Sequence, residues 1–577
     1  MPILLAVCLV VCALALVTIP FLSCNRRAER PNFVLVVVDA LRPDFLGCYG
    51  CRMPTSPNID QLAAGGVVFE SAVSHAPWTK SAFSSMLTAL YPFQHGVVNW
   101  EAAMPDTIMT LPEILSSQGY NTMAVVNMLG LTGESKVMKG IAEISEGHKH
   151  DRDAPATTEA AIELIKASSK PFFIIIHYFD THWPYRPPQE YVDMISGAGA
   201  PDSTDPACAL RLRYGGCVRF VDQSIGRLVA FLDGAGMRND TVLLITADHG
   251  EGLMAHGAGS HGTNLYDEAI RVPLIITYPA RYGKGLRIAD QVRHIDLLPT
   301  IVDLAGARDG QRREGTSLDP LIRKGSRSAD LPVGKGKGSL LPVDCALCEI
   351  GLRDVPEAKC IRTNDWKLII EPSTAAIQLY DLTQDRGELT NLWGSGPTAG
   401  DTLLRVIGRV PGVSVKGWRI GFTGSMRTGG IRADVQVGSE GRIRLAEPVA
   451  GSNLLSFRLS EDSTAMEVIA GPQGLQIMLF EVEPSDRPVT FKFTADGQDA
   501  PQAVSVGETG ERPFGQAFVL TLDDAMGLPR AFGQSRSSTA SGVSLWWLPG
   551  EHLQRAQKAV ILSPEEQNRL RSLGYIH

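Results

Sequence analysis

The chain has 577 residues, of which 44% are hydrophobic, so it can bury a large core and fold into more than one domain. Its formal net charge is −8, and acidic and basic residues are mixed along the sequence. This balance gives no electrostatic reason to expect a nucleic acid as a partner.

The chain begins with an uncharged and mostly apolar stretch, residues 2–23. Such a stretch is either a cleaved signal or a membrane anchor. Ser23 and Cys24 at its end resemble a bacterial lipoprotein processing site. Beside an uncleaved anchor, the arginines that follow would instead favour the cytoplasmic side for the rest of the chain. We therefore interpret residues 1–24 as a signal, lipoprotein or anchor segment, and expect an exported, membrane-tethered protein of the cell envelope.

Three apolar segments have the composition of strands buried on both faces of a parallel sheet. They span residues 31–38, 171–176 and 241–246. Asp39 follows the first of them, and Asp248 follows the third. Since ligands of such sheets gather beyond the carboxyl ends of the strands, we expect the two carboxylates to meet in space.

An acid and an imidazole stand side by side in Asp248-His249. Burying both is costly unless something pairs with them, and a divalent cation accepts a carboxylate oxygen and an imidazole nitrogen together. The glycine-rich loop that follows adds Glu251 and His261. The alternative is structural, with a capped strand end, a polar loop, and Asp39 as a helix cap.

The spacing of apolar residues predicts a helix over residues 82–90, and Thr79 falls just before it. Thr79 is either the N-cap of this helix or a nucleophile. The N-terminus of a helix favours an anion, and a nearby metal would favour the alkoxide form of the hydroxyl. His177 and His182 follow the apolar segment that begins at residue 171, where they are either structural or part of a site.

Seven segments occur in an order that resembles the sulfatase family of the alkaline phosphatase superfamily. They are VLVVVDALRPDFLGCYG, APWTKSAFSSMLTALYPFQHGV, HYFDTHWPY, TADHGEGLMAHG, HGTNLYDEAIRVPLII, HIDLLPTIVDLAG and LYDLTQDRGELTNL. The resemblance covers residues 31–395. It implies an α/β catalytic domain with an alkaline-phosphatase-like mixed sheet flanked by helices, a small antiparallel C-terminal subdomain, and one divalent metal.

The resemblance also assigns roles to individual residues. Asp39, Asp248 and His249 match the family's metal ligands. His182 matches the histidine near the ester oxygen, and His261 stands where many sulfatases carry a lysine that contacts the sulfate. Its imidazole could donate a hydrogen bond or act as general acid. Ca²⁺ is the metal that the resemblance implies, and the same ligand types permit Mg²⁺, Mn²⁺ or Zn²⁺.

The chain departs from the family pattern in two places. Ala40 stands where many sulfatases have a second metal-binding acid, and an alanine cannot coordinate. The usual motif C/S-x-P-x-R, whose first residue becomes formylglycine, is replaced by Thr79-Lys80-Ser81-Ala82-Phe83. Oxidation of a threonine side chain would yield a ketone, so we predict that the chain uses no formylglycine.

Thr79 with Asp39, Asp248 and His249 resembles the single-metal site of threonine-nucleophile relatives in the same superfamily. We therefore predict a metal-dependent hydrolase that cleaves sulfate esters or, more in keeping with Thr79, phosphate esters through a covalent threonine intermediate. Lys80 either holds an ester oxygen or is a solvated residue. The substrate would be a small-molecule, lipid or glycan ester. The alternatives are a phospho-group transferase acting on an envelope lipid or glycan, and a noncatalytic metal-binding protein.

Alternating apolar and polar residues, separated by Gly-, Pro- and Ser-rich turns, predict an all-β accessory domain over residues 400–548. We expect a sandwich that either packs on the catalytic domain or binds a ligand. A capping box at residues 563–566 predicts a final helix, so residues 549–577 are expected to return to the catalytic unit. Cys208 and Cys217 close a short loop and could form a disulfide in an oxidising compartment.

Overall fold

The computed structural model describes residues 30–548 with internal gaps. The gaps are 129, 148–150, 198–205, 326–340, 343, 353–354, 356, 372–375, 394–397, 408–416, 424–430, 439–440, 449–455, 471–475, 484–487, 496–502, 507–509, 514–515 and 521–541. The predictions for residues 1–24 and 549–577 therefore lie outside the described residues. Within the described part of the chain, no helix has both the length and the apolar composition needed to cross a bilayer.

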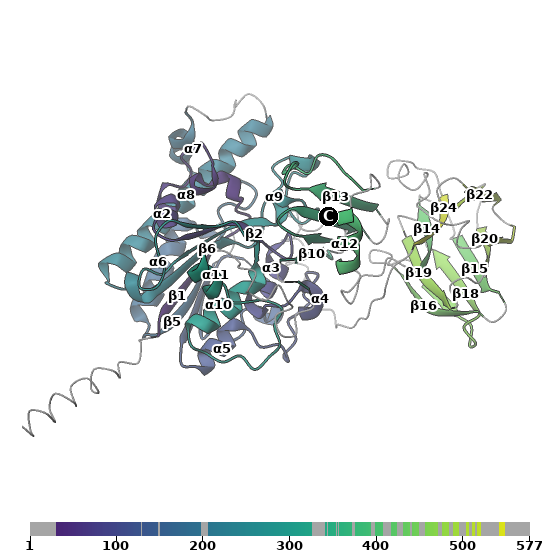
Figure 1. The fold of residues 1–577 in the computed structure, drawn as a ribbon, viewed down its shortest axis with the longest axis horizontal. Helices are drawn as coiled ribbons and strands as arrows, with labels where there is room; N and C mark the ends of the chain where they lie inside the picture. The colour runs from purple at the N-terminus through teal and green to yellow at the C-terminus, as the bar shows by residue number, and fades with distance from the viewer. Residues whose placement is uncertain are drawn as a thin grey trace, which may run out of the picture.

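A mixed sheet of nine described strands forms the centre of the larger body (Figure 1). Eight strands follow the order β4-β3-β5-β1-β6-β7-β2-β8, and β9 pairs with β2. Neighbours are parallel except the two pairs that involve β7. The strands are β1 (Asn32–Val38), β2 (Val67–Val73), β3 (Asn121–Val126), β4 (Glu143–Glu146), β5 (Phe172–Tyr178), β6 (Thr241–Ala247), β7 (Arg271–Thr277), β8 (Leu286–Ile288) and β9 (Val292–Arg293).

The three strands predicted from their apolar runs are the central strands β5, β1 and β6. Every residue of these strands is buried, as expected for strands covered on both faces. The boundaries agree within one residue except at the end of β5, which continues through Tyr178 and so includes His177. This places His177 within the strand, opposite Val37 of β1, and not in the loop that follows.

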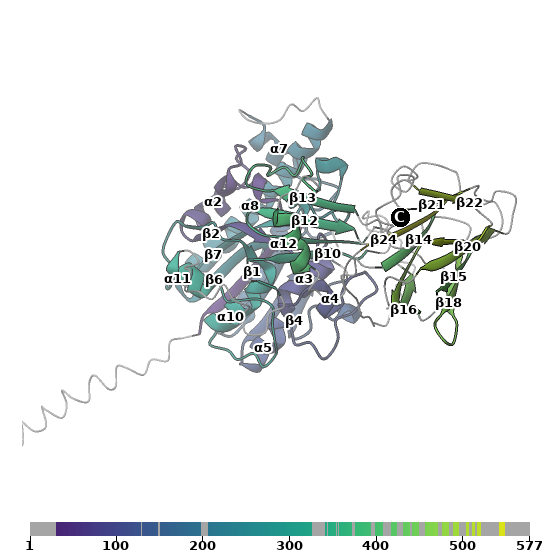
Figure 2. The ribbon, with the colours of Figure 1, turned by 45° about the vertical axis from the view of Figure 1, so that its right-hand side comes forward.

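Helices cover the sheet in two groups (Figures 1 and 2). In the first group α8 packs against α2, α6 and α7, and in the second α10 packs against α3, α5 and α11. The helices are α2 (Pro57–Ala64), α3 (Thr79–Thr88), α4 (Pro92–His95), α5 (Leu111–Ser117), α6 (Ala154–Ala167), α7 (Gln189–Ile195), α8 (Pro206–Gly234), α9 (Asp267–Ile270), α10 (Leu297–Leu304) and α11 (Asp319–Lys324). The predicted α/β class with helices flanking a mixed sheet is confirmed.

A four-stranded antiparallel sheet forms the predicted small subdomain. Its strands pair in chain order and are β10 (Ala346–Ile350), β11 (Ala358–Arg362), β12 (Trp366–Glu371) and β13 (Ala376–Asp381). Helix α12 (Thr398–Ile407) packs on β11 and β12. This helix crosses the boundary predicted at residue 400, so the all-β region begins after it.

Two antiparallel-rich sheets form the sandwich expected in the accessory region. The strand orders are β16-β19-β14-β24-β21-β22 and β17-β18-β15-β20-β23. Both sheets contribute to one core, in which Phe480 and Phe491 lie 6.1 Å apart between ring centroids. Figures 1 and 2 both draw this body beyond the small sheet. The strands are β14 (Gly417–Thr423), β15 (Ile431–Val437), β16 (Arg442–Pro448), β17 (Ser456–Leu459), β18 (Ala465–Ala470), β19 (Gln476–Glu483), β20 (Val489–Ala495), β21 (Ala503–Val506), β22 (Gly510–Pro513), β23 (Phe518–Leu520) and β24 (Gly542–Leu548).

The suggested disulfide between Cys208 and Cys217 is wrong. Both residues are free thiols in the single helix α8. Nine helical residues separate their Cα atoms by roughly 13 Å, whereas a disulfide needs less than about 7 Å.

Candidate active site

Two aspartates meet at the carboxyl edge of the large sheet, as predicted. Asp39 follows β1 and Asp248 follows β6, and the last paired residues of these parallel strands are Val38 and Ala247. Both carboxylates are fully buried. The backbone N–H of Ala40 donates to Asp248 Oδ1 at 3.0 Å, which fixes one carboxylate against the turn that carries the other.

Thr79 is the first residue of α3 and lies beside both acids. The helix therefore begins three residues earlier than predicted, and the residue at the N-cap is Trp78. The N-cap interpretation of Thr79 is accordingly wrong, and its hydroxyl points toward the acids and His249. Thr79 Oγ1 lies 3.5 Å from Asp39 Oδ2 and 3.3 Å from His249 Nε2.

The orientation of His249 leaves one ring nitrogen available at the site. Its Nδ1 donates to the carbonyl oxygen of Gly250 at 2.8 Å. In the neutral ring this hydrogen bond makes Nε2 the unprotonated nitrogen, which is the form that coordinates a metal. Nε2 lies 3.4 Å from Asp248 Oδ2, so the available nitrogen, the hydroxyl and both acids share one small volume.

His177, left as either structural or part of a site by the sequence analysis, joins this cluster. Ligand atoms of Asp39, His177 and Asp248 all lie within 4.8 Å of one another. The parallel register that pairs His177 with Val37 brings its ring beside the end of β1, where its Nε2 lies 3.2 Å from Asp39 Oδ2. The available signal was the strand boundary, because a histidine near the end of a buried strand lies at the edge where the acids gather.

Several buried atoms of the cluster make no hydrogen bond to a described residue. They are Asp39 Oδ1, Asp248 Oδ2 and both ring nitrogens of His177. Leaving such groups unsatisfied costs about 1–3 kcal/mol each, and more for charged groups. A divalent cation would satisfy the two carboxylate oxygens and one nitrogen of His177 together, so the residues present fit the metal that the family resemblance implies.

The two acids also perturb one another. Burial and the neighbouring charge of Asp248 raise the pKa of Asp39 to about 6. For Asp248 burial acts in the same direction, but His249, His177 and the hydrogen bond from Ala40 outweigh it and lower the pKa. Two carboxylates held this close favour a cation between them.

Two further imidazoles, predicted from the resemblance, stand next to the cluster. The ring centroids of His261 and His249 lie 4.3 Å apart, and those of His261 and His182 lie 5.0 Å apart. His182 is fully buried, and its Nδ1 donates to the carbonyl oxygen of Trp183 at 2.6 Å. The structure thus brings all the predicted imidazoles together, while their catalytic roles stay predictions.

Glu251 positions His261. The Nδ1 of His261 lies 3.2 and 3.3 Å from the two carboxylate oxygens of Glu251, which is fully buried. This contact favours the ring form with a proton on Nδ1 and turns Nε2 away from Glu251. We describe Glu251 as a positioning residue for His261.

The variant Glu251→Gln is expected to lower kcat by about 10- to 100-fold, because general acid catalysis contributes about 10² to 10⁴-fold and the amide holds the ring less well. The loss should be smaller for a nitrophenyl ester, whose leaving group needs no proton, than for an alkyl ester. Steady-state kinetics on both esters measure this, with Glu251→Asp as the matched variant that keeps the carboxylate. An equal loss on both esters would contradict the assignment.

The side chain of Lys80 is hydrogen-bonded within the protein. Its ammonium donates to the carbonyl oxygen of Trp100 at 2.7 Å, and the residue is buried. The solvated alternative is therefore wrong. Its predicted contact with an ester oxygen stays a prediction.

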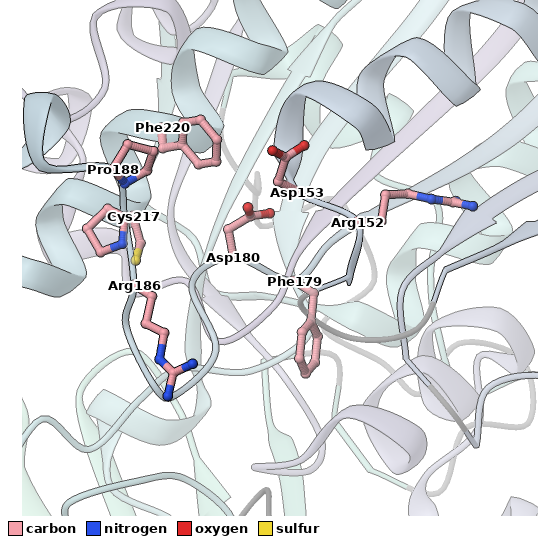
Figure 3. A pocket seen from close by; sticks show the side chains of 9 residues that line it. Arg152, Asp153, Phe179, Asp180, Arg186, Pro188, Cys217 and Phe220 are labelled. Carbon is pink, nitrogen blue, oxygen red and sulfur yellow. The ribbon is translucent and has the colours of Figure 1, made fainter.

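A pocket of about 290 Å³ lies next to the imidazoles. Phe179 lines it and stacks on His182, with 4.5 Å between ring centroids. Figure 3 shows the carboxylate of Asp180 at the centre of the lining residues, while the guanidinium groups of Arg152 and Arg186 point outward. One phenyl ring thus separates this pocket from the site.

Together the mixed sheet and the acids, imidazoles and hydroxyl at its carboxyl edge define an α/β ester hydrolase of the alkaline-phosphatase-like class. Residues 31–307 match the family model described as Sulfatase, and this part of the chain belongs to the sulfatase family. The uncharacterized sulfatase YidJ of Escherichia coli K12 is 25% identical over 434 residues, which cover 63% of this chain and 83% of YidJ.

Solved structures support the same fold. BT4656, in complex with its substrate D-glucosamine-2-N,6-O-disulfate, aligns with a TM-score of 0.55 and 19% identity, over 66% of this chain and 97% of that one. The phosphonate monoester hydrolase of Agrobacterium radiobacter aligns with a TM-score of 0.55 and 20% identity, over 66% and 96% of the two chains. At these identities the likeness concerns the fold.

Proposed function

We propose that this sulfatase-family hydrolase cleaves phosphate esters in a metal-dependent reaction, with Thr79 as a nucleophile that forms a covalent intermediate. The observation that carries the proposal is the position of the Thr79 hydroxyl, 3.5 Å from Asp39 Oδ2 and 3.3 Å from His249 Nε2. Asp39, Asp248, His249 and Thr79 would hold the cation. A bound divalent cation supplies positive charge that favours the alkoxide of Thr79 and neutralises the ester oxygens.

In the first step, Thr79 gives up its hydroxyl proton to water, its Oγ1 attacks phosphorus, and the bond between phosphorus and the leaving oxygen breaks. His261, or His182 beside it, donates a proton to that oxygen, so an alcohol leaves. In the second step, water gives a proton to the imidazole that lost one and attacks phosphorus. The bond to Thr79 Oγ1 breaks, the phosphate group leaves, and Thr79 takes a proton back from water.

The chemistry of threonine favours phosphorus over sulfur. A formylglycine hydrate releases sulfate by regenerating its aldehyde, but a sulfothreonine has no such exit and must be attacked at sulfur. Phosphorus tolerates a second displacement of this kind. Thr79 therefore supports a phosphate ester, although the family name and the substrate of BT4656 point to sulfate.

The substrate is expected to be a small-molecule, lipid or glycan ester. The pocket beside Phe179 offers room for a part of it other than the reacting group. Export to the envelope and a membrane tether belong to the same proposal, and rest on the sequence of residues 1–24 alone.

A panel of nitrophenyl sulfate, phosphate monoester, phosphate diester and phosphonate, each assayed with Ca²⁺, Mg²⁺, Mn²⁺ and Zn²⁺, tests the proposal. We expect turnover of a phosphorus ester that stops on chelation and returns with metal. Turnover of the sulfate alone would overturn the choice of phosphorus. Product release only with an added alcohol would indicate a transferase, and no turnover together with metal binding would indicate a noncatalytic protein.

A further inference from the structure

His177 is a buried imidazole that the reaction steps above do not use. It is 0% exposed, and it lies near the carboxyl end of the apolar strand β5. The ring of Phe83 packs edge-on against it, with 5.2 Å between centroids. A polar ring at such a position is expected to have partners for both nitrogens, yet neither nitrogen makes a hydrogen bond to a described residue.

A purely structural pairing of His177 with Asp39 does not account for the geometry. His177 Nε2 approaches Asp39 Oδ2 at 3.2 Å, but without the alignment of a hydrogen bond. Asp39 Oδ1 and Asp248 Oδ2 make no hydrogen bond to a described residue either. Three residues thus converge, each with an unsatisfied atom, within 4.8 Å. Convergence of this kind is what a shared cation requires.

We propose that His177 is a metal ligand and that it makes the site select Zn²⁺ over Ca²⁺. The inference rests on the proposed use of a metal and names the ion. Ala40 offers no ligand atom, so a carboxylate oxygen that many sulfatases have is absent here. His177 and His249 supply two nitrogens beside the oxygens of Asp39, Asp248 and Thr79. Imidazole suits Zn²⁺, whereas Ca²⁺ prefers a shell of six to eight oxygens.

Metal titration of the purified full chain, stripped by chelation, tests the proposal without an activity assay. Wild type is expected to bind one Zn²⁺ at least about 100-fold more tightly than Ca²⁺, as measured by competition with a chelator dye. The variant His177→Ala should lose at least about 10-fold in Zn²⁺ affinity, since removal of even an outer partner of a ligand costs about 10–100-fold. Its Ca²⁺ affinity should change by less than about threefold.

His95→Ala is the matched control. His95 is also fully buried, but its ring contacts Ser85 and the backbone N–H of Val97 at 3.0 Å each, outside the cluster. The variant His95→Ala should leave the Zn²⁺ affinity and the Ca²⁺ affinity unchanged. An equal loss of Zn²⁺ and Ca²⁺ affinity in His177→Ala would assign His177 to positioning Asp39, and an unchanged Zn²⁺ affinity would remove it from the site. Either result overturns the proposal.

X-ray absorption of the Zn²⁺-loaded wild type provides a measurement that needs no folded variant. Two imidazole ligands are expected, and one or none would overturn the proposal. These measurements also separate the inference from the proposed function. If no ester is turned over but Zn²⁺ binding depends on His177, the function fails and the ligand assignment stands. If esters are turned over and Zn²⁺ binding does not depend on His177, the function stands and the ligand assignment fails.

Discussion

Replacing Thr79 with valine is expected to lower kcat for a phosphorus ester by at least about 10⁴-fold, because loss of a nucleophile of this kind costs about 10⁶-fold in a well-studied protease. Thr79 is 0% exposed, and valine has nearly the same shape, so the variant removes the hydroxyl without opening a cavity. Thr79→Ser keeps a hydroxyl at the start of α3 and should retain turnover within about tenfold. Initial rates on the best ester of the panel measure both effects.

The covalent intermediate gives a second readout. Wild type quenched in acid during turnover should carry a phosphate group on Thr79, detectable by mass spectrometry of the peptide, and Thr79→Val should carry none. Ser84→Ala is the control, because the Ser84 hydroxyl donates within its own helix to the carbonyl oxygen of Lys80 at 2.7 Å. Full turnover by Thr79→Val would remove Thr79 from the role of nucleophile.

The meeting of Asp39 and Asp248 could be predicted because it depends on one general property of parallel sheets. Two buried apolar runs, each ending in an acid, place those acids at the same edge whenever the strands are neighbours. Their residues 38 and 247 are indeed paired in register. The approach of Thr79 to the same point followed only from the family resemblance, since nothing local to the helix fixes where its first residue lies.

The role of His177 stayed open in the sequence for a physical reason. Apolar composition marks a buried strand but does not fix its end, and a shift of one or two residues decides whether a histidine belongs to the strand or to the loop. The contact between Glu251 and His261 could not be inferred either. Residues ten apart in a glycine-rich loop meet only once the surrounding backbone is fixed.

A buried network of charges between the small sheet and the large one could not be predicted from the sequence either. Asp267 at the start of α9 contacts Arg362 at 2.7 Å and Lys367 at 2.9 Å. Lys367 also lies 2.8 Å from Glu388, and Arg362 donates to Ser71 of β2. About a hundred residues separate the acid from its cations, so only the folded chain brings them together. Helix α9, which contains Asp267, is also hydrogen-bonded to the active-site loop, because the N–H of Gly250 donates to the carbonyl oxygen of Ala269 at 2.8 Å.

Replacing Asp267 with alanine is expected to lower the free energy of unfolding by about 3–5 kcal/mol, because removing one partner of a buried ion pair leaves its charge uncompensated. Here the side chain of Arg362, 5% exposed, would lose its carboxylate, and that of Lys367, 0% exposed, would keep only Glu388. Calorimetric unfolding at pH 7 measures the effect. Asp106→Ala is the control: its pair with Lys136 has side chains 77% and 44% exposed, and such pairs contribute only about 0–1 kcal/mol. Equal, small losses in both variants would contradict the prediction.

The same network predicts a pH dependence with a definite sign. The neighbouring Arg362 and Lys367 outweigh burial and hold the pKa of Asp267 well below its usual range. A carboxylate whose pKa is lowered by folding stabilises the protein above the unfolded pKa of about 3.9, and loses that contribution as the pH falls below it. The difference in unfolding temperature between wild type and Asp267→Asn should therefore be constant down to about pH 5 and shrink below pH 4. For Glu388, burial and the neighbouring Asp267 raise the pKa to about 6, so this group acts in the opposite direction between its unfolded value and pH 6, and less so in Asp267→Asn. Below about pH 4, Glu388 is protonated in the folded and the unfolded state, so there the comparison isolates Asp267. A difference that grows below pH 4 would rule out the role of Asp267 as a carboxylate that compensates these buried cations.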